Sequence, residues 1–517
     1  MGGHGARGGR IGRCLALAAA LPLAFGNAAT AAQPPAASPV QAPATAPTVA
    51  IPAAAQPAPA APVEIPALTP AQAQTALEVL RAADLQGLQP KSYVPEGLAD
   101  SGVLTAAQQT ALADGLVRYA RDAHIGRMDP GAFPELWAVR PADYDPSADL
   151  VKALGEGRLR VWLDSLPPRY AGYAALKRGL ARYREIAAKG AWKPVPEGKP
   201  LKLGGKDPRA AALRARLAAE DALVPATGPG FDKPLQEAVQ RAQRRFGLNP
   251  DGVAGREVLA YLNQPIGQRI LQITANMERW RWLPSTMPAT RLQVNSGAAI
   301  VTLFRDDKPV LSMKAVSGRR GDETPMLMST IHSVVINPPW NVPTGIAAKE
   351  LWPKEKANPG YLARNGYRII PVEGGQPRLQ QASGDDSALG RFKFDFDNPF
   401  AVYLHDTPSK GGFDRFSRQA SHGCVRLEKP RLLAEALLAG DAKWTPEAID
   451  TQLEGDKTVR APLSAKVPVF IFYWTAFAGA DGLMQFRADP YDWDRDLLQR
   501  VGVLAPPAPK VQVAAKV

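Results

Sequence analysis

Cys424 is the residue of this chain whose type and surroundings most directly suggest chemistry. It follows His422 by two residues and His405 by nineteen. A cysteine with histidines nearby has the makings of an activated thiolate nucleophile. A free cysteine is more often a small buried hydrophobe. However, the Ser, His, Gly and Arg at their offsets around Cys424 would coincide by chance at about one cysteine in 10⁵, which favours catalysis.

The second cysteine lies near the start of the 517-residue chain. Cys14 opens a twelve-residue apolar stretch behind three arginines, and an Ala-Thr-Ala cleavage site follows at residues 29–31. This stretch is too short to span a bilayer, and no later segment approaches the required ~20 apolar residues. We therefore expect residues 1–31 to be a signal peptide. The exported chain then has Cys424 as its only thiol, without a partner for an internal disulfide.

Amino-acid composition and net charge limit the classes of molecule that the exported chain can bind. Residues 32–65 are mostly Ala, Pro, Gln, Thr and Val, which predicts an extended Ala/Pro-rich linker. The chain has 62 Lys plus Arg against 49 Asp plus Glu, a formal net charge of +13. A basic exported protein is attracted to polyanions, and its compartment excludes nucleic acid. Anionic envelope polymers or a membrane surface remain, although we interpret most of the charge as solvated surface.

Strands must position Cys424 and the histidines. Residues 402–405 predict a strand that points Tyr403 and His405 to the same face. Alternating apolar residues predict the other strands, of which 299–304 and 309–316 form a hairpin around an Asp306-Asp307 turn. The predicted strands span residues 291–295, 299–304, 309–316, 329–337, 392–396, 401–405, 424–427 and 467–474. The last third of the chain is therefore mostly β, in a sandwich or a barrel.

Residues 338–388 interrupt the strands. They are rich in proline and aromatic residues and poor in strand signals. A segment of this length inside a compact domain is usually a functional lid or a small subdomain. We predict an inserted lid or capping subdomain.

The N-terminal half has a helical pattern. Thr69 and Pro70 form an N-cap and first-turn pair, and Ala/Leu/Arg-rich stretches follow at 104–122, 148–164 and 171–189. We expect an all-α region over 66–205, in which His124 is structural. Residues 206–265 form a separate unit with a helix from Asp232, a Gly-rich turn and a helix over 255–262. This unit resembles the three-helix peptidoglycan-binding repeat on Phe246, Gly247, Leu248, Asp251, Gly252 and Gly255.

The passage from residue 398 to residue 426 resembles the catalytic signature of the L,D-transpeptidases. Those enzymes carry a strand ending in His, a loop, and Ser/Thr-His-Gly-Cys followed by Val or Ile and Arg. The likeness extends over about residues 66–490 to the large Gram-negative subgroup, including the stretches 277–284, 336–345 and 389–396.

The resemblance implies a multidomain α+β fold class. An all-α scaffold (66–205) and a three-helix peptidoglycan-binding module (206–265) precede a mostly β catalytic domain (270–490). That domain contains the capping subdomain (338–388), and residues 491–517 form a C-terminal tail. The resemblance also implies a location in the periplasm, in association with the cell wall.

The resemblance assigns roles to the site residues. It makes Cys424 the nucleophile and His405 the general base, although sequence distance alone favours His422. His422 then orients the thiolate or helps to shape the oxyanion site, to which backbone amides at 422–424 contribute. Arg426 either holds a substrate carboxylate through a bidentate contact or forms a structural ion pair. The full set of expected substrate-binding residues is Tyr403, Ser421, Gly423, Arg426, Trp340 and Asn341.

The implied chemistry is acyl transfer without a metal or cofactor. Cys424 attacks the third, diamino-acid residue of a peptidoglycan tetrapeptide and D-Ala leaves. The side-chain amine of a second stem then resolves the thioester to give a 3–3 cross-link. We also expect acylation by carbapenems, and functional coupling to D,D-carboxypeptidases and glycan-polymerising enzymes.

Three alternatives stay open at this point. An L,D-carboxypeptidase would use water as the acceptor on the same nucleophile, and a related enzyme would attach the stem to a protein lysine. A catalytically silent wall-binding scaffold is the third, and the intact Cys424, His405 and His422 argue against it.

Overall fold

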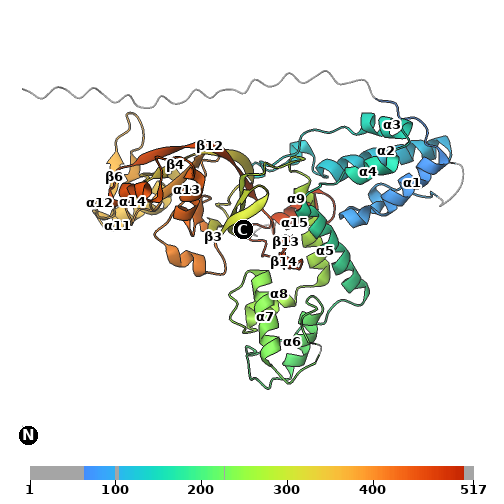
Figure 1. The fold of residues 1–517 in the computed structure, drawn as a ribbon, viewed down its shortest axis with the longest axis horizontal. Coiled ribbons are helices and arrows are strands. Elements are labelled where there is room, and N and C mark those ends of the chain that lie inside the picture. The colour runs from blue at the N-terminus through green and yellow to red at the C-terminus, as the bar shows by residue number, and fades with distance from the viewer. Residues whose placement is uncertain (1–62, 99–103, 226, 506–517) are drawn as a thin grey trace, which may run out of the picture. The chain divides into compact units, whose positions relative to one another are not determined.

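A computed structural model describes residues 63–98, 104–225 and 227–505. The predicted signal peptide and most of the predicted linker lie outside these residues. Helices dominate up to residue 280 and a large sheet follows, so the predicted multidomain α+β class is confirmed (Figure 1). The N-terminal helices are α1 (Pro70–Arg81), α2 (Ala106–Ile125), α3 (Ser147–Gly155), α4 (Leu159–Ser165), α5 (Ala171–Ala188), α6 (Arg209–Ala218), α7 (Lys233–Phe246), α8 (Arg256–Leu262) and α9 (Ile266–Trp280).

Helices α1–α4 lie together in one bundle (Figure 1), and their buried side chains form one apolar core. Thr69 caps α1 through a capping box with Gln72, as the sequence pattern predicts. The single stretch expected at 148–164 is two helices, α3 and α4. They separate around Gly157, whose φ of +66° is a left-handed conformation that favours glycine.

Helix α5 belongs to a second core, which it shares with α6–α9 and with the C-terminal end of the described chain. Its buried face consists of Tyr173, Leu176, Leu180 and Tyr183. Gly179 permits the close packing, because a Cβ there would lie 2.4 Å from the Met484 sulfur. The region expected to form one scaffold domain therefore contributes to two cores.

The strands of the catalytic half close into a barrel. Eight strands pair in the ring order β3-β11-β9-β8-β4-β12-β1-β2, and β2 pairs back onto β3 while β10 pairs with β3 outside the ring. This is one of the two predicted architectures. The strands are β1 (Arg291–Asn295), β2 (Ile300–Arg305), β3 (Lys308–Gly318), β4 (Leu327–Ile336), β8 (Phe392–Phe396), β9 (Leu404–His405), β10 (Gln419–Ser421), β11 (Val425–Leu427) and β12 (Val459–Phe472).

Two helices follow the barrel strand β11. Helix α13 (Pro430–Leu438) buries Leu433, Ala434 and Leu438 in the same core as the inward side chains of the strands. Helix α14 (Pro446–Glu454) adds Ile449 to that core.

Residues 338–388 fold into a small unit with its own core, which we call the cap. Its strands β5 (Trp340–Asn341), β7 (Arg378–Gln381) and β6 (Tyr367–Ile370) form a three-stranded sheet. Its helical turns are α10 (Thr344–Ile346), the π-helix η4 (Ala347–Leu351), α11 (Trp352–Ala357) and α12 (Tyr361–Arg364). The buried core residues are Val342, Ala347, Leu351, Leu362 and Leu379.

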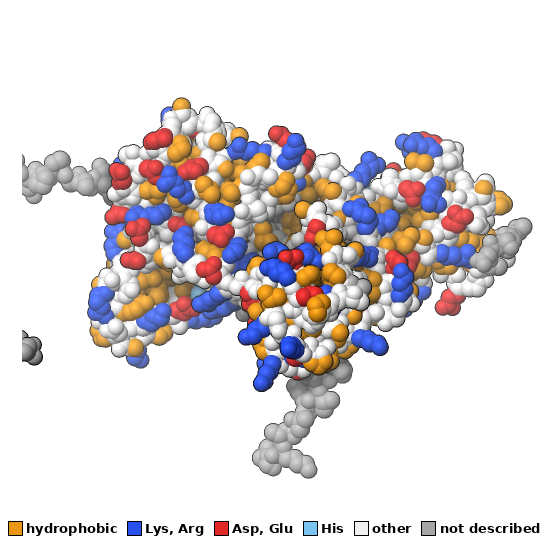
Figure 2. Space-filling view, turned by 60° about the horizontal axis from the view of Figure 1, so that its bottom comes forward, with side chains coloured by type: hydrophobic (Ala, Val, Ile, Leu, Met, Phe, Trp, Pro, Cys, Tyr) orange, Lys and Arg blue, Asp and Glu red, His pale blue; other side chains and the backbone are white. Residues whose placement is uncertain are grey.

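The expected C-terminal tail begins with a packed helix that the sequence did not predict. After the hairpin β13 (Ala476–Ala478) and β14 (Met484–Phe486), helix α15 (Trp493–Arg500) buries Trp493, Leu497 and Leu498 in the second core. None of the described helices has the length and apolar composition needed to cross a membrane. On the face in Figure 2, basic and acidic side chains are interspersed rather than gathered in one basic stripe.

Candidate active site

Strand register gathers four of the predicted site residues on one face of the barrel wall. Strands β9 and β11 run parallel, with Leu404 opposite Val425 and His405 opposite Arg426. Leu404 and Val425 point into the barrel core. Because side chains alternate along a strand, the flanking residues point outward together. This outward set is Tyr403, His405, Cys424 and Arg426.

A cavity of about 470 Å³ lies over this face, between the barrel wall and the cap. Two predicted residues do not line it. Asn341 accepts a hydrogen bond from Gln380 within the cap sheet at 2.8 Å, and Gly423 belongs to the turn before Cys424. The predicted residues that do line it are Trp340, Tyr403, His405, Ser421, His422, Cys424 and Arg426.

The Cys424 thiol is protonated at rest. Burial raises its pKa above the ordinary value of 9.0. Hydrogen bonds from the backbone and hydroxyl of Tyr403, and the positive charges of Lys393 and Arg426, oppose that rise without cancelling it. The free site therefore does not hold a permanent thiolate, and this thiol would need a base to become a nucleophile.

His405 is suited to be that base because it is uncharged. It is only 4% exposed, and burial followed by the charge of Arg426 lowers its pKa to about 3. At neutral pH the imidazole is neutral and has a lone pair with which to accept a proton. Its Nδ1 is buried without a hydrogen-bond partner among the described residues. The ring lies 5.6 Å from the ring of Tyr403, centroid to centroid.

Arg426 has no carboxylate partner among the described residues, so the structural ion pair considered from the sequence is not formed there. Its Nε is buried without an acceptor, and burial lowers its pKa. A guanidinium that lines a cavity without a counter-ion is suited to bind an anionic group of a ligand.

Hydrogen bonds brace the turn at residues 421–424. The Ser421 hydroxyl donates to the Cys424 carbonyl at 2.6 Å and accepts from the Gly423 N–H at 3.3 Å. The Thr324 hydroxyl donates to the Gly423 carbonyl at 2.7 Å. Gly423 has a φ of +104°, which favours glycine. Sequence reasoning missed Thr324, since it lies 99 residues away and carries no local signal.

His422 contacts the cap. Its Nε2 lies 2.7 Å from the Glu350 Oε1 on the π-helix η4, and no hydrogen bond joins it to the Cys424 thiol among the described residues. We predicted that His422 orients the thiolate, and the part of the chain that the structure describes shows no direct contact through which it would do so. Glu350 itself was not predicted from the sequence.

Lys393 is a second residue that sequence reasoning missed. It lies opposite His405 on β8, and its Nζ lies 4.5 Å above the Tyr403 ring and 2.7 Å from the Asp395 carboxylate. The signal was available, because the Phe-Lys-Phe-Asp-Phe alternation of residues 392–396 puts both charged residues on the outward face.

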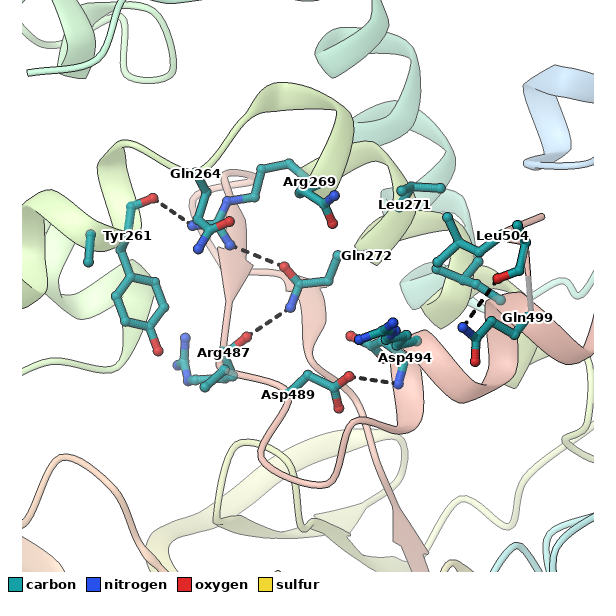
Figure 3. Close-up of a pocket in the computed structure, with 16 residues that line it drawn as sticks. Tyr261, Gln264, Arg269, Leu271, Gln272, Arg487, Asp489, Asp494, Gln499 and Leu504 are labelled. Atoms are coloured by element: carbon teal, nitrogen blue, oxygen red, sulfur yellow. Dashed lines mark hydrogen bonds between the residues drawn. The ribbon is translucent and has the colours of Figure 1, made fainter. Parts of the chain in front are cut away.

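A larger cavity of about 820 Å³ lies elsewhere, among α8, α9 and α15 (Figure 3). Gln272 there donates to the Arg487 carbonyl, and the Asp494 N–H donates to Asp489. Its lining contains no cysteine, serine, lysine or histidine, and hence no nucleophile–base pair of the predicted kind. No group of metal-binding side chains occurs among the described residues.

Three segments match known protein families. Residues 66–180 match a “Scaffold domain”, residues 206–262 a “Putative peptidoglycan binding domain”, and residues 289–455 the “L,D-transpeptidase catalytic domain” (YkuD). The resemblance stated from the sequence, with these domains in this order, is confirmed.

A Haemophilus influenzae protein named “Putative L,D-transpeptidase” is 35% identical over 242 residues, which cover 44% of this chain and 48% of that protein. The chain thus matches about half the length of this relative. Among solved structures, an L,D-transpeptidase from Stackebrandtia nassauensis is 14% identical, with a TM-score of 0.23 over 55% of this chain and 97% of its own. One from Xylanimonas cellulosilytica is 16% identical, with a TM-score of 0.19 over 54% and 100%.

Proposed function

We propose that this chain, which carries an L,D-transpeptidase catalytic domain behind a scaffold domain and a peptidoglycan-binding domain, is a peptidoglycan L,D-transpeptidase with Cys424 as its nucleophile. One observation carries the proposal. The paired strands β9 and β11 present a thiol, a neutral imidazole and a guanidinium without a counter-ion to the same cavity. Those groups are the nucleophile, base and carboxylate receptor of an acyl transfer from a peptide.

In the first half-reaction His405 takes the thiol proton, and the Cys424 sulfur attacks the carbonyl of the third residue of a tetrapeptide stem. The C–N bond to the terminal D-Ala breaks, the imidazolium returns the proton to the leaving amine, and a thioester remains. Arg426 holds the D-Ala carboxylate. Since the Gly423 N–H already donates to Ser421, the backbone amides of His422 and Cys424 are left to stabilise the oxyanion.

In the second half-reaction the side-chain amine of another stem attacks the thioester. The C–S bond breaks, the thiol regains a proton, and an amide joins the third residues of the two stems as a 3–3 cross-link. Attack by water instead would give a tripeptide, which is the L,D-carboxypeptidase alternative.

Incubation of the exported chain with disaccharide-tetrapeptide, followed by liquid chromatography and mass spectrometry, tests the proposal. We expect a dimer lacking one D-Ala. We expect no product from Cys424→Ala, and a rate about 10²–10⁴-fold lower from His405→Ala. His332→Ala is the matched control, because His332 lies on β4 and not in the cavity lining. Tripeptide alone would favour the carboxypeptidase, and full activity of Cys424→Ala would refute the proposed nucleophile.

The same nucleophile supports acylation by carbapenems. The Cys424 sulfur would open the strained β-lactam amide and retain the drug as a thioester, which intact-mass analysis detects as one adduct per chain. An adduct that persists in Cys424→Ala would contradict this.

The predicted signal peptide at residues 1–31 supports a location in the periplasm. The need for tetrapeptide donors supports coupling to D,D-carboxypeptidases and to glycan-polymerising enzymes. Fractionation of cells, and growth of strains that lack a D,D-carboxypeptidase, test these two points.

A further inference from the structure

Glu350 brings a carboxylate from the cap to the edge of the active-site cavity. It lies on the π-helix η4, a rare element that often marks functional positions. Its Oε1 is held by the His422 Nε2 at 2.7 Å, and the Arg319 Nη2 lies 3.6 Å from the same oxygen. The other oxygen, Oε2, has no hydrogen-bond donor among the described residues. Glu350 is thus fixed on one side and open on the other.

The charges around the cavity are otherwise mostly positive. The cationic lining residues are Arg319, Lys349, Lys354 and Arg426, against the two carboxylates of Asp322 and Glu350. One oxygen of Asp322, Oδ2, accepts a hydrogen bond from Arg319 at 2.7 Å, so each carboxylate has one engaged oxygen. Burial acts to raise the pKa of Glu350. The hydrogen bond and charge of His422, with Arg319 and Lys354, outweigh that effect and hold the pKa below its usual range. Glu350 is therefore an ionised carboxylate with a free oxygen at this cavity, and it is the one that the cap supplies.

The two substrates of the proposed reaction differ in charge at their reacting ends. The donor stem ends in a carboxylate, for which the cationic residues are suited. The acceptor reacts through a primary amine, which is an ammonium at neutral pH and is repelled by those same residues. A cationic group entering a mostly positive cavity is most stable beside a carboxylate with a free oxygen, and Glu350 is the one on the cap.

We propose that Glu350 is the receptor for the acceptor ammonium, with Oε2 binding the amine while His422 holds Oε1 in place. The inference rests on the proposed function and deepens it, since it assigns an acceptor subsite to the cap. Glu350 is a positioning residue, and the covalent steps remain those of Cys424. The bound ammonium gives one proton to the neutral His405 before its nitrogen attacks the thioester, and the departing sulfur takes the second. Transfer to an amine then depends on Glu350, whereas hydrolysis by water does not.

The test is the ratio of 3–3 dimer to tripeptide formed from disaccharide-tetrapeptide, normalised to the D-Ala released. In Glu350→Gln the amide oxygen can still accept from His422, but the charge is gone. We expect this ratio to fall at least about tenfold, as for the loss of one charge-assisted hydrogen bond. Glu373→Gln is the matched control, because Glu373 is an exposed cap glutamate outside the cavity lining, and its ratio should equal that of the unmodified chain.

A different role for Glu350 gives a different pattern. If Glu350 only fastens the cap to His422, then Glu350→Gln keeps the ratio, and only Glu350→Ala, which removes the contact, slows D-Ala release. An unchanged ratio in Glu350→Gln therefore overturns the inference and leaves the proposed function standing. An unmodified chain that releases D-Ala and forms tripeptide alone also overturns it. A chain that releases no D-Ala overturns the proposed function itself.

Discussion

The protonation state of Cys424 gives the sharpest test of the site's electrostatics. Burial raises the pKa of this thiol above 9.0, and the Tyr403 hydroxyl is one of the groups that oppose the rise. At pH 7 a thiol of that pKa is ionised to less than about 1%. A permanent thiolate–imidazolium pair would instead be ionised throughout the neutral range. The change to make is Tyr403→Phe, which removes the hydroxyl and keeps the ring.

The magnitude follows from the loss of one hydrogen bond to an ionised group. Such a bond contributes about 1.5–3 kcal/mol, which is about 1–2 pKa units. Because the hydroxyl favours the thiolate, its removal raises the pKa of Cys424 further. At any pH below the pKa the thiolate fraction, and hence the alkylation rate, falls about 10–100-fold.

The assay is alkylation of Cys424 by iodoacetamide between pH 5 and 10, followed by intact-mass analysis of the chain without residues 1–31. We expect the rate of the unmodified chain to rise tenfold per pH unit until above pH 9. Tyr367→Phe is the matched control, because Tyr367 lines the cavity from the cap and does not act on the thiol. A rate that levels off below pH 8, or equal profiles for Tyr403→Phe and the unmodified chain, would refute this account.

Three further predictions follow from the same geometry. The pKa of His405 is about 3 in the folded chain and 6.5 in the unfolded one, so stability falls as the pH drops below 6.5. From pH 7 to pH 5 the unmodified chain should lose about 2 kcal/mol more unfolding free energy than His405→Gln, measured by urea unfolding at each pH; equal losses would contradict the buried neutral imidazole. Arg426→Gln should raise the KM for the tetrapeptide about tenfold or more, with partial rescue in Arg426→Lys; an unchanged KM would exclude the carboxylate receptor. Gly423→Ala should lose about 1–2 kcal/mol from the positive φ and slow D-Ala release, whereas an unchanged melting temperature would mean that the turn relaxes without cost.

The alternation of apolar and polar residues along single strands explains which parts of the fold and site could be predicted from the sequence. The expected strands at 291–295 and 392–396 coincide with β1 and β8, because each alternates between the barrel core and the outer face. Tyr403 and His405 are two residues apart in an extended segment, so the same alternation places them on one face. The structure then puts that face beside Cys424 and Arg426, through the pairing of β9 with β11.

Contacts between distant segments explain what could not be predicted. The closure of β2 onto β3 and the position of β11 between β3 and β9 depend on pairing that no local pattern encodes. Glu350 lies 72 residues from His422, on an irregular helix within a segment without clear periodicity. The α15 side chains are buried in the second core, which combines helices more than two hundred residues earlier in the chain with neighbours such as Tyr473 and Tyr491.

The choice between His405 and His422 as base cannot be made from their sequence distances to Cys424 alone, and the contacts of the two imidazoles in the structure decide it. His422 is nearer to Cys424 in sequence, but its imidazole is bonded to Glu350 in the cap. His405 lies opposite Arg426 in the strand register, and after burial Arg426 is the main cause of its lowered pKa. Cys424 lies directly before β11, two residues before Arg426, and there the charge of Arg426 lowers the thiol pKa less than Tyr403 and Lys393 do. A carboxylate bound at Arg426 would offset that charge and raise the basicity of His405. In the proposed reaction the D-Ala carboxylate supplies this charge while the thiol must be deprotonated. When D-Ala leaves, the charge of Arg426 is again uncompensated and favours the neutral imidazole that the second half-reaction requires.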